Sequence, residues 1–335
     1  MKLVKILERL LSAIPVALGV ALLAFFSMRL LPGDPVEIML GDTQASQAEL
    51  DALRRELGLD QPLHLQLWDF FTGLLRGDLG TSIVQRQDVV EILATTLPAT
   101  IELTLATLVV AVLIAVPVGI LSAVRQGSWL DRLVLSGALL GVSMPAFWFG
   151  LLLILLFAVE LRWLPTSGQM DPAIDLHRIT GFLLLDSLLA WNWQAFLSAL
   201  KHLLLPAFTL GIVFSAVLAR VIRSSMVEVL RMEYLTAARA KGVPEWQVIL
   251  KHAFRNALIP AVTVTGLHLG ELLGGNMIVE TIFSWPGLGR LVVSSIFAKD
   301  YVVVQAAVML YAITYVLANL LVDILYTVLN PKVEL

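Results

Sequence analysis

The chain has 335 residues, of which 58% are hydrophobic and 15% are charged, and its formal net charge at pH 7 is -3. A soluble globular domain of this length does not need so apolar a composition, so the sequence indicates an integral membrane protein. The small net charge gives no sign of nucleic-acid binding. Because the chain has no cysteine, disulfides, thiolate metal sites and a cysteine nucleophile are excluded.

Six apolar segments are long enough to cross a hydrocarbon layer about 30 Å thick, which takes about 20 helical residues. The sequence therefore predicts an all-α membrane protein with six transmembrane helices. The first segment follows Lys2, Lys5 and Arg9, but it is too long for a signal peptide and lacks a small-residue cleavage site, so we expect an uncleaved anchor. The predicted spans are residues 10 to 31, 98 to 124, 133 to 159, 203 to 222, 257 to 281 and 303 to 327.

Basic residues concentrate in two connecting segments, residues 125 to 132 and 223 to 256. Loops rich in lysine and arginine face the cytoplasm, so we expect both loops there, together with both chain termini. The basic residues in and just before these loops are Arg125, Arg132, Arg220, Arg223, Arg231, Arg239, Lys241, Lys251 and Arg255.

Residues 32 to 97 lie on the opposite side in this arrangement, and acidic residues outnumber basic ones in them. The segment is long enough for a small extracytoplasmic subdomain. We expect a turn at Pro32 to Pro35, a helix from about Ser46 to Gly58 and an apolar helix from Leu63 to Leu75.

A second outer segment, about residues 162 to 200, is rich in tryptophan and leucine. Its tryptophan rings are predicted at the membrane interface in preference to a binding cage. We therefore divide the chain into residues 1 to 97, the first transmembrane helix plus the extracytoplasmic segment, and residues 98 to 335. The second part is a five-helix core that contains the cytoplasmic loop of residues 223 to 256.

Residues 233 to 260 form a polar interruption between two long apolar segments. Gly242 follows an apolar stripe at the place where a helix C-terminus prefers glycine, and Pro244 suits the first turn of a second helix. The sequence thus predicts two short helices that meet at a glycine-centred corner. The stripe with helical spacing consists of Met226, Val229, Leu230, Tyr234 and Ala238.

Motifs of enzymes and of nucleotide-driven pumps are missing from the sequence. It contains no catalytic serine and lysine pattern, no H-E-x-x-H zinc motif and no G-x-x-x-x-G-K-[ST] phosphate-binding loop. We therefore expect that the chain neither hydrolyses ATP nor binds a metal or cofactor itself. The histidines are scattered without ligand spacing, at His64, His177, His202, His252 and His268.

An ion-coupled secondary transporter would place ionisable residues near the middle of the membrane. The candidates are His268 and Glu271, which are three residues apart on the fifth predicted span and so share a helix face. From these residues alone, three roles are open. The pair can line a translocation pathway, couple a proton gradient to transport, or form a hydrogen-bonded contact with a neighbouring helix.

Residues 236 to 242 form a loop of the pattern E-A-A-x-x-x-G, with Thr236 in place of the glutamate. This loop resembles that of permease subunits of bacterial binding-protein-dependent ABC importers. Three runs are similar to the dipeptide and oligopeptide branch: Ala238 to Gly242, His252 to Pro260, and Glu280 to Arg290, the last almost residue for residue. Motifs that resemble the first permease subunit of this branch are Pro32 to Pro35, Glu56 to Asp60 and Gly77 to Ser82.

The resemblance implies the type I ABC importer permease fold, in one half of a heterodimer in the bacterial inner membrane. The implied partners are a second homologous permease, two ATPase subunits that bind ATP and Mg, and an extracytoplasmic peptide-binding protein. Dipeptides or short peptides are the implied cargo. Close relatives carry oligopeptides, glutathione or nickel complexes, so these are alternatives, and a non-transporting scaffold or receptor subunit is an alternative of another class.

The resemblance also implies that the short helix ending at Gly242 docks into a cleft of an ATPase and passes its movement to the membrane helices. Small side chains on its contact face suit close approach. From the residues alone, an amphipathic helix on anionic lipid explains the loop equally well. The residues assigned to coupling are Thr236, Ala237, Ala238, Arg239, Lys241 and Gly242.

Residues 280 to 290 are predicted to form an outer turn after the fifth span. Pro286, Gly287 and Gly289 should shape this turn, and Trp285 lies beside them. Its favoured role is to pack the helix ends, and contact with the substrate is the alternative.

Overall fold

The computed structural model describes residues 15, 18 to 26, 36, 46 to 56 and 59 to 329. Within these residues the chain is built from helices, with no β-strand and a lone bridge between Thr81 and Asp88. The predicted all-α class is confirmed. Most of the first predicted span, residues 10 to 31, the predicted turn at Pro32 to Pro35 and both termini lie outside the described residues.

The outer segment holds the two short helices that the sequence predicts, α3 (Gln47–Glu56) and α4 (Leu63–Arg76). α4 ends at Gly77, whose φ of 76° is one that glycine adopts without strain. Further along, the Ser82 hydroxyl donates a hydrogen bond of 2.5 Å to the buried carboxylate of Asp300. Because Asp300 directly precedes the last long helix, this bond attaches the outer segment to it.

Three helices of the described part are long and apolar enough to cross a membrane. Two of them begin with a side-chain cap, in which Asp88 accepts from the amide of Val90 and Asn192 from that of Ala195. These helices contain the second, fourth and sixth predicted spans, and the first two begin several residues earlier than predicted. They are α5 (Val89–Val124), α9 (Trp193–Leu230) and α15 (Tyr301–Leu329).

The third predicted span, residues 133 to 159, is wrong as a single straight helix. The chain forms two segments there that are bent by 103° at a break. Proline at position 145 lacks an amide hydrogen and forces the preceding Met144 out of the helical region, to φ -89° and ψ 126°. If the two bent segments are counted as one broken span, they are the fourth candidate membrane span in the described part of the chain. It comprises α6 (Trp129–Ser143), α7 (Ala146–Leu153) and the π-helix η1 (Ile154–Glu160).

The fifth predicted span, residues 257 to 281, also differs from the structure. Its helix α12 (Phe254–Leu273) ends at a pair of glycines, and Gly275 has φ of 82°. The residues that follow form the separate helices α13 (Met277–Ile282) and α14 (Leu288–Phe297). α12 has 20 residues, but it is polar at several positions and is not among the three apolar spans.

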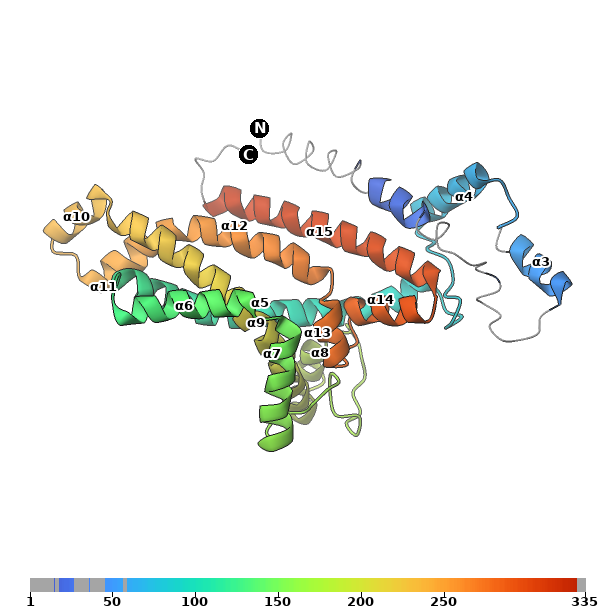
Figure 1. Ribbon diagram of the computed structural model, residues 1–335, viewed down its shortest axis with the longest axis horizontal. Coiled ribbons are helices and arrows are strands. Elements are labelled where there is room, and N and C mark those ends of the chain that lie inside the picture. Colours follow the sequence, from blue (N-terminus) through green and yellow to red (C-terminus); the bar gives the residue numbers. More distant parts are fainter. Residues whose placement is uncertain (1–14, 16–17, 27–35, 37–45, 57–58, 330–335) are drawn as a thin grey trace.

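α5, α12 and α15 run roughly along the longest axis of the molecule, and α7 projects steeply from them (Figure 1). α5 packs along α9, and α12 packs against α15, α9 and α5. The short helix α8 (Leu183–Leu189) contacts α9 within the projection. At the opposite end from α14, the chain turns through its polar loop (Figure 1), where the largest buried cluster joins α5, α9 and α12.

Candidate functional site

The polar loop forms the predicted corner. α10 (Glu233–Ala240) is followed by Gly242 with φ of 78°, and then by α11 (Glu245–Gln247) and the π-helix η2 (Val248–Ala253), which leads into α12. The amide of Gly242 donates to the Arg239 carbonyl at 2.9 Å, so glycine closes the helix end as the sequence indicates. The glycine-centred corner between two helices is confirmed.

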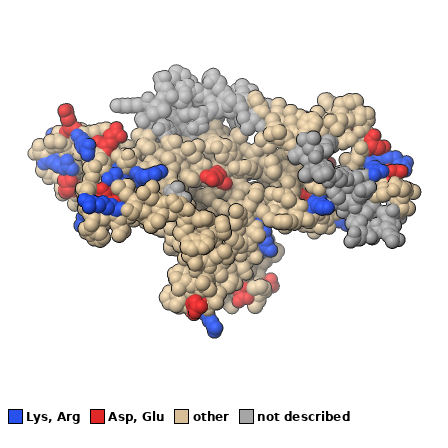
Figure 2. All heavy atoms as spheres, viewed as in Figure 1, with Lys and Arg blue, Asp and Glu red and all other residues tan. Residues whose placement is uncertain are grey.

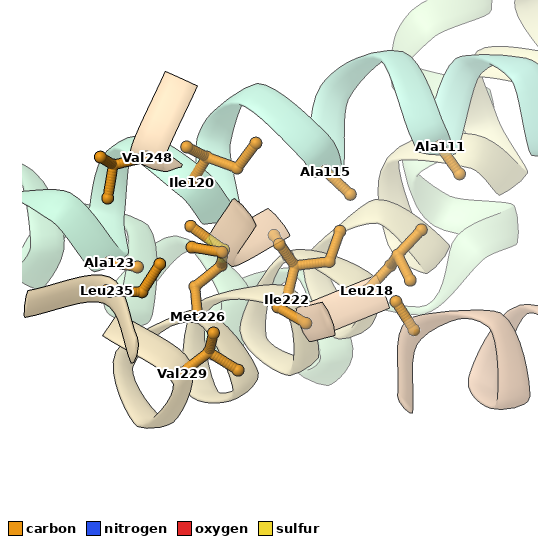
Figure 3. Close-up of a cluster of buried hydrophobic side chains, with 14 of the residues drawn as sticks. Ala111, Ala115, Ile120, Ala123, Leu218, Ile222, Met226, Val229, Leu235 and Val248 are labelled. Carbon is orange, nitrogen blue, oxygen red and sulfur yellow. The ribbon is translucent and has the colours of Figure 1, made fainter. Parts of the chain in front are cut away.

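The apolar stripe of the loop does not lie on one helix. α9 ends at Leu230, before the turn that starts α10, so the helical phase is reset between Leu230 and Tyr234. Tyr234 is therefore 40% exposed, whereas its neighbour Leu235 is fully buried. Leu235 lies beside Ala123 of α5 and the end of α9 (Figure 3). Leu235 was not predicted to be buried, because a continuous helix through residue 232 would have turned its side chain away from the apolar stripe.

The coupling residues lie on the outer surface of this corner. Thr236, Ala237, Arg239, Lys241 and Gly242 are exposed, and Ala238 is half-buried. Figure 2 shows charged side chains of both signs gathered over this end of the molecule. The helix thus presents short side chains and charges outward while Leu235 holds its inner face.

An ion pair spans the corner. The Arg239 guanidinium donates to both carboxylate oxygens of Glu245, at 2.9 and 3.1 Å. These hydrogen bonds lower the pKa of Glu245 below its usual value and raise the pKa of Arg239. Both side chains are well exposed, so the pair orients α11 relative to α10 more than it stabilises the fold.

A second, buried ion pair connects the membrane helices close to the corner. Asp131 in the first turn of α6 accepts from Arg223 of α9 through both oxygens, at 2.5 and 2.8 Å. It also accepts from the hydroxyl of Ser122 on α5 and from the amide of Gly127. The Asp131 side chain is only 3% exposed. The sequence did not predict this pair, because Asp131 and Arg223 are 92 positions apart and meet only in the fold.

His268 and Glu271 lie together on α12, as predicted. The His268 Nδ1 atom is 3.1 Å from the Glu271 carboxylate, and the two side chains are 32% and 72% exposed. They line a hollow of about 370 Å³ between α12 and α15, which we name the central hollow. The His268 ring also packs on Phe214 of α9, with ring centroids 4.3 Å apart. The other residues of the central hollow are Leu267, Tyr311 and Tyr315.

The outer turn is packed into the fold. Trp285 is 1% exposed and donates from Nε1 to the Ala99 carbonyl of α5 at 2.8 Å. Gly287 and Gly289 are also buried, whereas Pro286 is exposed. These positions fit the predicted packing of helix ends, since a substrate could not reach the tryptophan ring.

The glycines of the outer turn surround a buried carboxylate that the sequence did not single out. Glu280 is fully buried and accepts from the Thr100 hydroxyl and the Arg290 amide, at 3.2 and 3.0 Å. A β-carbon on Gly287 or Gly289 would stand 2.5 or 3.0 Å from its Oε2 atom. Glu280 therefore explains why the turn needs glycine at these two positions.

Another buried carboxylate, Glu102 of α5, was also missed. It accepts from the Leu184 amide at 2.8 Å and lies 3.4 Å from the Gln169 amide nitrogen. No group of three or more histidine, aspartate or glutamate side chains within the described residues could hold a metal ion. The buried carboxylates of Glu102, Asp131 and Glu280 accept hydrogen bonds from backbone amides and neutral side chains and, at Asp131, from one arginine.

Comparison with known proteins places these sites in a family. The family described as "Binding-protein-dependent transport system inner membrane component" matches residues 115 to 335. The N-terminal component of the same kind of transport system matches residues 2 to 104. Both matches together cover the corner, the central hollow and the outer turn.

Individual relatives are similar over almost the whole chain. The di/tripeptide transport system permease protein of Pseudomonas aeruginosa is 46% identical over 98% of both chains. A probable D,D-dipeptide transport system permease protein of Escherichia coli is 46% identical over 97% of this chain and 96% of its own. The glutathione transport system permease protein of Salmonella typhimurium is 44% identical over 98% of both chains. The chain therefore belongs to the family of inner membrane components of binding-protein-dependent transport systems.

Proposed function

We propose that the chain is the transmembrane subunit of an ATP-driven importer of dipeptides or other short peptides. The similar permeases are named for di/tripeptides, D,D-dipeptides and glutathione, which are all short peptides with a free amino group and carboxylates. Oligopeptides and nickel complexes are alternative cargoes for the same fold. The chain supplies the multi-pass membrane pathway, and ATP and Mg bind to partner subunits.

The complex contains a second homologous permease, two ATPase subunits and an extracytoplasmic peptide-binding protein. Both termini of this chain and the loop of residues 223 to 256 face the cytoplasm, in keeping with their basic residues. The extracytoplasmic segment, with its surplus of acidic residues, contacts the binding protein. Selectivity then rests mainly on that delivering protein.

One observation carries the coupling part of the proposal. α10 is exposed on its outer face, yet its single buried residue, Leu235, belongs to the same cluster as α5, α9 and α12. Such a helix can receive a push from an ATPase and pass it directly to three membrane helices. A helix that rested on lipid would instead need an apolar outer face, whereas α10 exposes Thr236, Ala237 and Arg239.

The proposal is tested with the purified complex in proteoliposomes. Uptake of a radiolabelled dipeptide is measured with ATP inside, binding protein outside, and a protonophore present to collapse the proton gradient. We expect uptake to continue at full rate and to stop when ATP is omitted. Uptake that stops with the protonophore would instead support a proton-coupled transporter that uses His268 and Glu271. The complete absence of cargo movement would support a scaffold or receptor subunit.

The cargo is tested in the same assay. A dipeptide, a tripeptide, a pentapeptide, glutathione and a nickel complex are compared at equal concentration, each with the binding protein that carries it. The expected order puts the dipeptide and tripeptide first. A preference for the pentapeptide or the nickel complex would contradict the proposed cargo and leave the proposed mechanism in place.

A further inference from the structure

The packing of α12 on α15 gives the central hollow its aromatic wall. Gly270 and Gly274 face α15, and a β-carbon on Gly270 would stand 2.8 Å from the ring of Tyr315. A β-carbon on Gly274 would overlap the ring of Tyr311. The two rings are therefore held against the α12 backbone, with their centroids 6.2 Å apart.

The chemistry of the central hollow is unusual for the middle of a membrane protein. Among its five lining residues, Glu271 is the one carboxylate, and neither lysine nor arginine is present to neutralise it. An acidic side chain on a membrane helix costs about 2.5 to 3.5 kcal/mol and marks a functional site by default. Figure 2 shows the middle of the molecule as largely free of charged side chains.

These groups match one kind of ligand. A carboxylate binds an ammonium group with a charge-assisted hydrogen bond, and the faces of tyrosine rings attract the same cation. The volume of about 370 Å³ lies within the range of small-molecule sites, roughly 300 to 1,000 Å³. Every short peptide with a free N-terminus carries an α-ammonium group.

We propose that the central hollow binds the α-ammonium group of a peptide during transport, with Glu271 as the acceptor and Tyr311 and Tyr315 around the cation. His268 orients the carboxylate through its 3.1 Å contact and leaves the second oxygen for the ligand. This inference rests on the proposed function, because it takes short peptides as the cargo. It adds a contact in the membrane subunit to the selection made by the binding protein.

The binding test uses small probes that need no binding protein. 3-Fluorotyrosine is placed at Tyr311 of the assembled complex in nanodiscs, and its ¹⁹F resonance is followed during titration. Alaninamide carries an ammonium group without a carboxylate, and N-acetylalanine carries a carboxylate without an ammonium group. We expect a saturable shift with alaninamide and none with N-acetylalanine.

Two variants identify the acceptor. Glu271→Gln should weaken the alaninamide response about tenfold or more, whereas Glu271→Asp should retain it. The absence of a saturable shift in the wild-type complex, equal shifts with both probes, or an unchanged response in Glu271→Gln would each overturn the proposal. A hollow that the second permease covers would give no shift, which counts against the proposal. If the Glu271→Gln complex does not assemble, the test rests on the wild-type complex, in which a saturable shift with alaninamide alone supports the proposal and any other result contradicts it.

Dipeptide uptake separates this inference from the proposed function. Wild-type proteoliposomes that take up dipeptide while alaninamide gives no shift would contradict the ammonium site alone. Proteoliposomes that show the shift but no ATP-driven dipeptide uptake would contradict the proposed function alone. With both intact, Glu271→Gln should lower uptake about tenfold while the loaded binding protein still stimulates ATP hydrolysis.

Discussion

Leu235 is the side chain that attaches the exposed α10 to the membrane core. It is fully buried, in one cluster with residues of α5, α9, η2 and α12. Its neighbours in the sequence are exposed. Leu235 is therefore the residue through which α10 contacts the buried cluster, and a force on α10 would be transmitted through this contact. The properties of single residues at the corner and at the outer turn lead to three predictions.

Truncation at this contact should loosen the corner. Leu235→Ala leaves a cavity and should cost about 2 to 5 kcal/mol of local stability. We expect faster hydrogen exchange in α10 and reduced stimulation of ATP hydrolysis by loaded binding protein. Leu250→Ala is the matched control, because Leu250 is 51% exposed and should leave both measurements unchanged. Equal effects of the two substitutions would contradict the anchoring role of Leu235.

The outer surface of the corner should tolerate little added bulk. Ala238→Trp should obstruct docking, and Gly242→Val should strain a backbone with φ of 78°, a conformation that β-branched residues avoid. Both variants are expected in the membrane at normal amounts but without dipeptide uptake. Gly242→Asn is the control, since asparagine accepts this conformation at small cost. Normal uptake together with normal ATP hydrolysis in both disruptive variants would rule out docking through this helix.

The outer turn should depend on the size of the residue at position 289. A β-carbon there would stand 2.8 Å from the Met277 amide nitrogen, so Gly289→Ala must displace backbone as well as Glu280. We expect a lower midpoint of thermal unfolding in detergent, by several degrees. Gly137→Ala serves as the control, because its β-carbon would meet no atom within 4 Å. A Gly289→Ala protein as stable as this control would refute the crowded turn.

Helices α5, α6 and α9 meet at Asp131, which joins them close to the corner. The carboxylate engages Arg223, Ser122 and Gly127 and is almost without exposure. A buried charge that loses its partner is far more costly than an exposed one. This contact ties α5, α6 and α9 to one another next to the corner.

A double-mutant cycle should measure the coupling energy between Asp131 and Arg223. Asp131→Asn and Arg223→Gln should each destabilise the protein by about 3 to 5 kcal/mol, and the double variant by less than the sum. The same cycle at Arg239 and Glu245 should give a coupling energy below about 1 kcal/mol, since that pair is exposed. Unfolding monitored by tryptophan fluorescence provides the free energies. Additive effects at Asp131 and Arg223 would show that their contact carries no coupling.

The sequence predicts an element well when the signal for it is local, and poorly when the element depends on contacts between residues far apart in the chain. The helices α5, α9 and α15 follow from long, mostly apolar runs, and the glycine of the corner follows from local backbone preference. The break at Pro145 and the end of α12 at Gly274 were missed because apolar length was weighed above proline and paired glycines. Glu280, Glu102 and Asp131 were out of reach, because their partners are distant in sequence and meet only in the fold.

The two ends of the molecule are expected on opposite sides of the membrane. Residues 233 to 256 are expected in the cytoplasm and α3 and α4 outside. Because the chain has no cysteine, single cysteines report the orientation without interference. Gln61→Cys should react with a membrane-impermeant maleimide in intact cells, and Lys241→Cys only after permeabilisation. Labelling of Lys241→Cys in intact cells would reverse the assigned topology.

α5 touches the sites at both ends of the molecule. With 36 residues it extends about 54 Å. Its C-terminal half shares the cluster of Leu235, and near its start Ala99 and Thr100 hold the outer turn. A rod fixed at both ends converts a small tilt at one tip into a matching displacement at the other. Under the proposed function, a movement that an ATPase starts at the corner would reach the outer turn in a single mechanical stroke, without a relay of separate contacts.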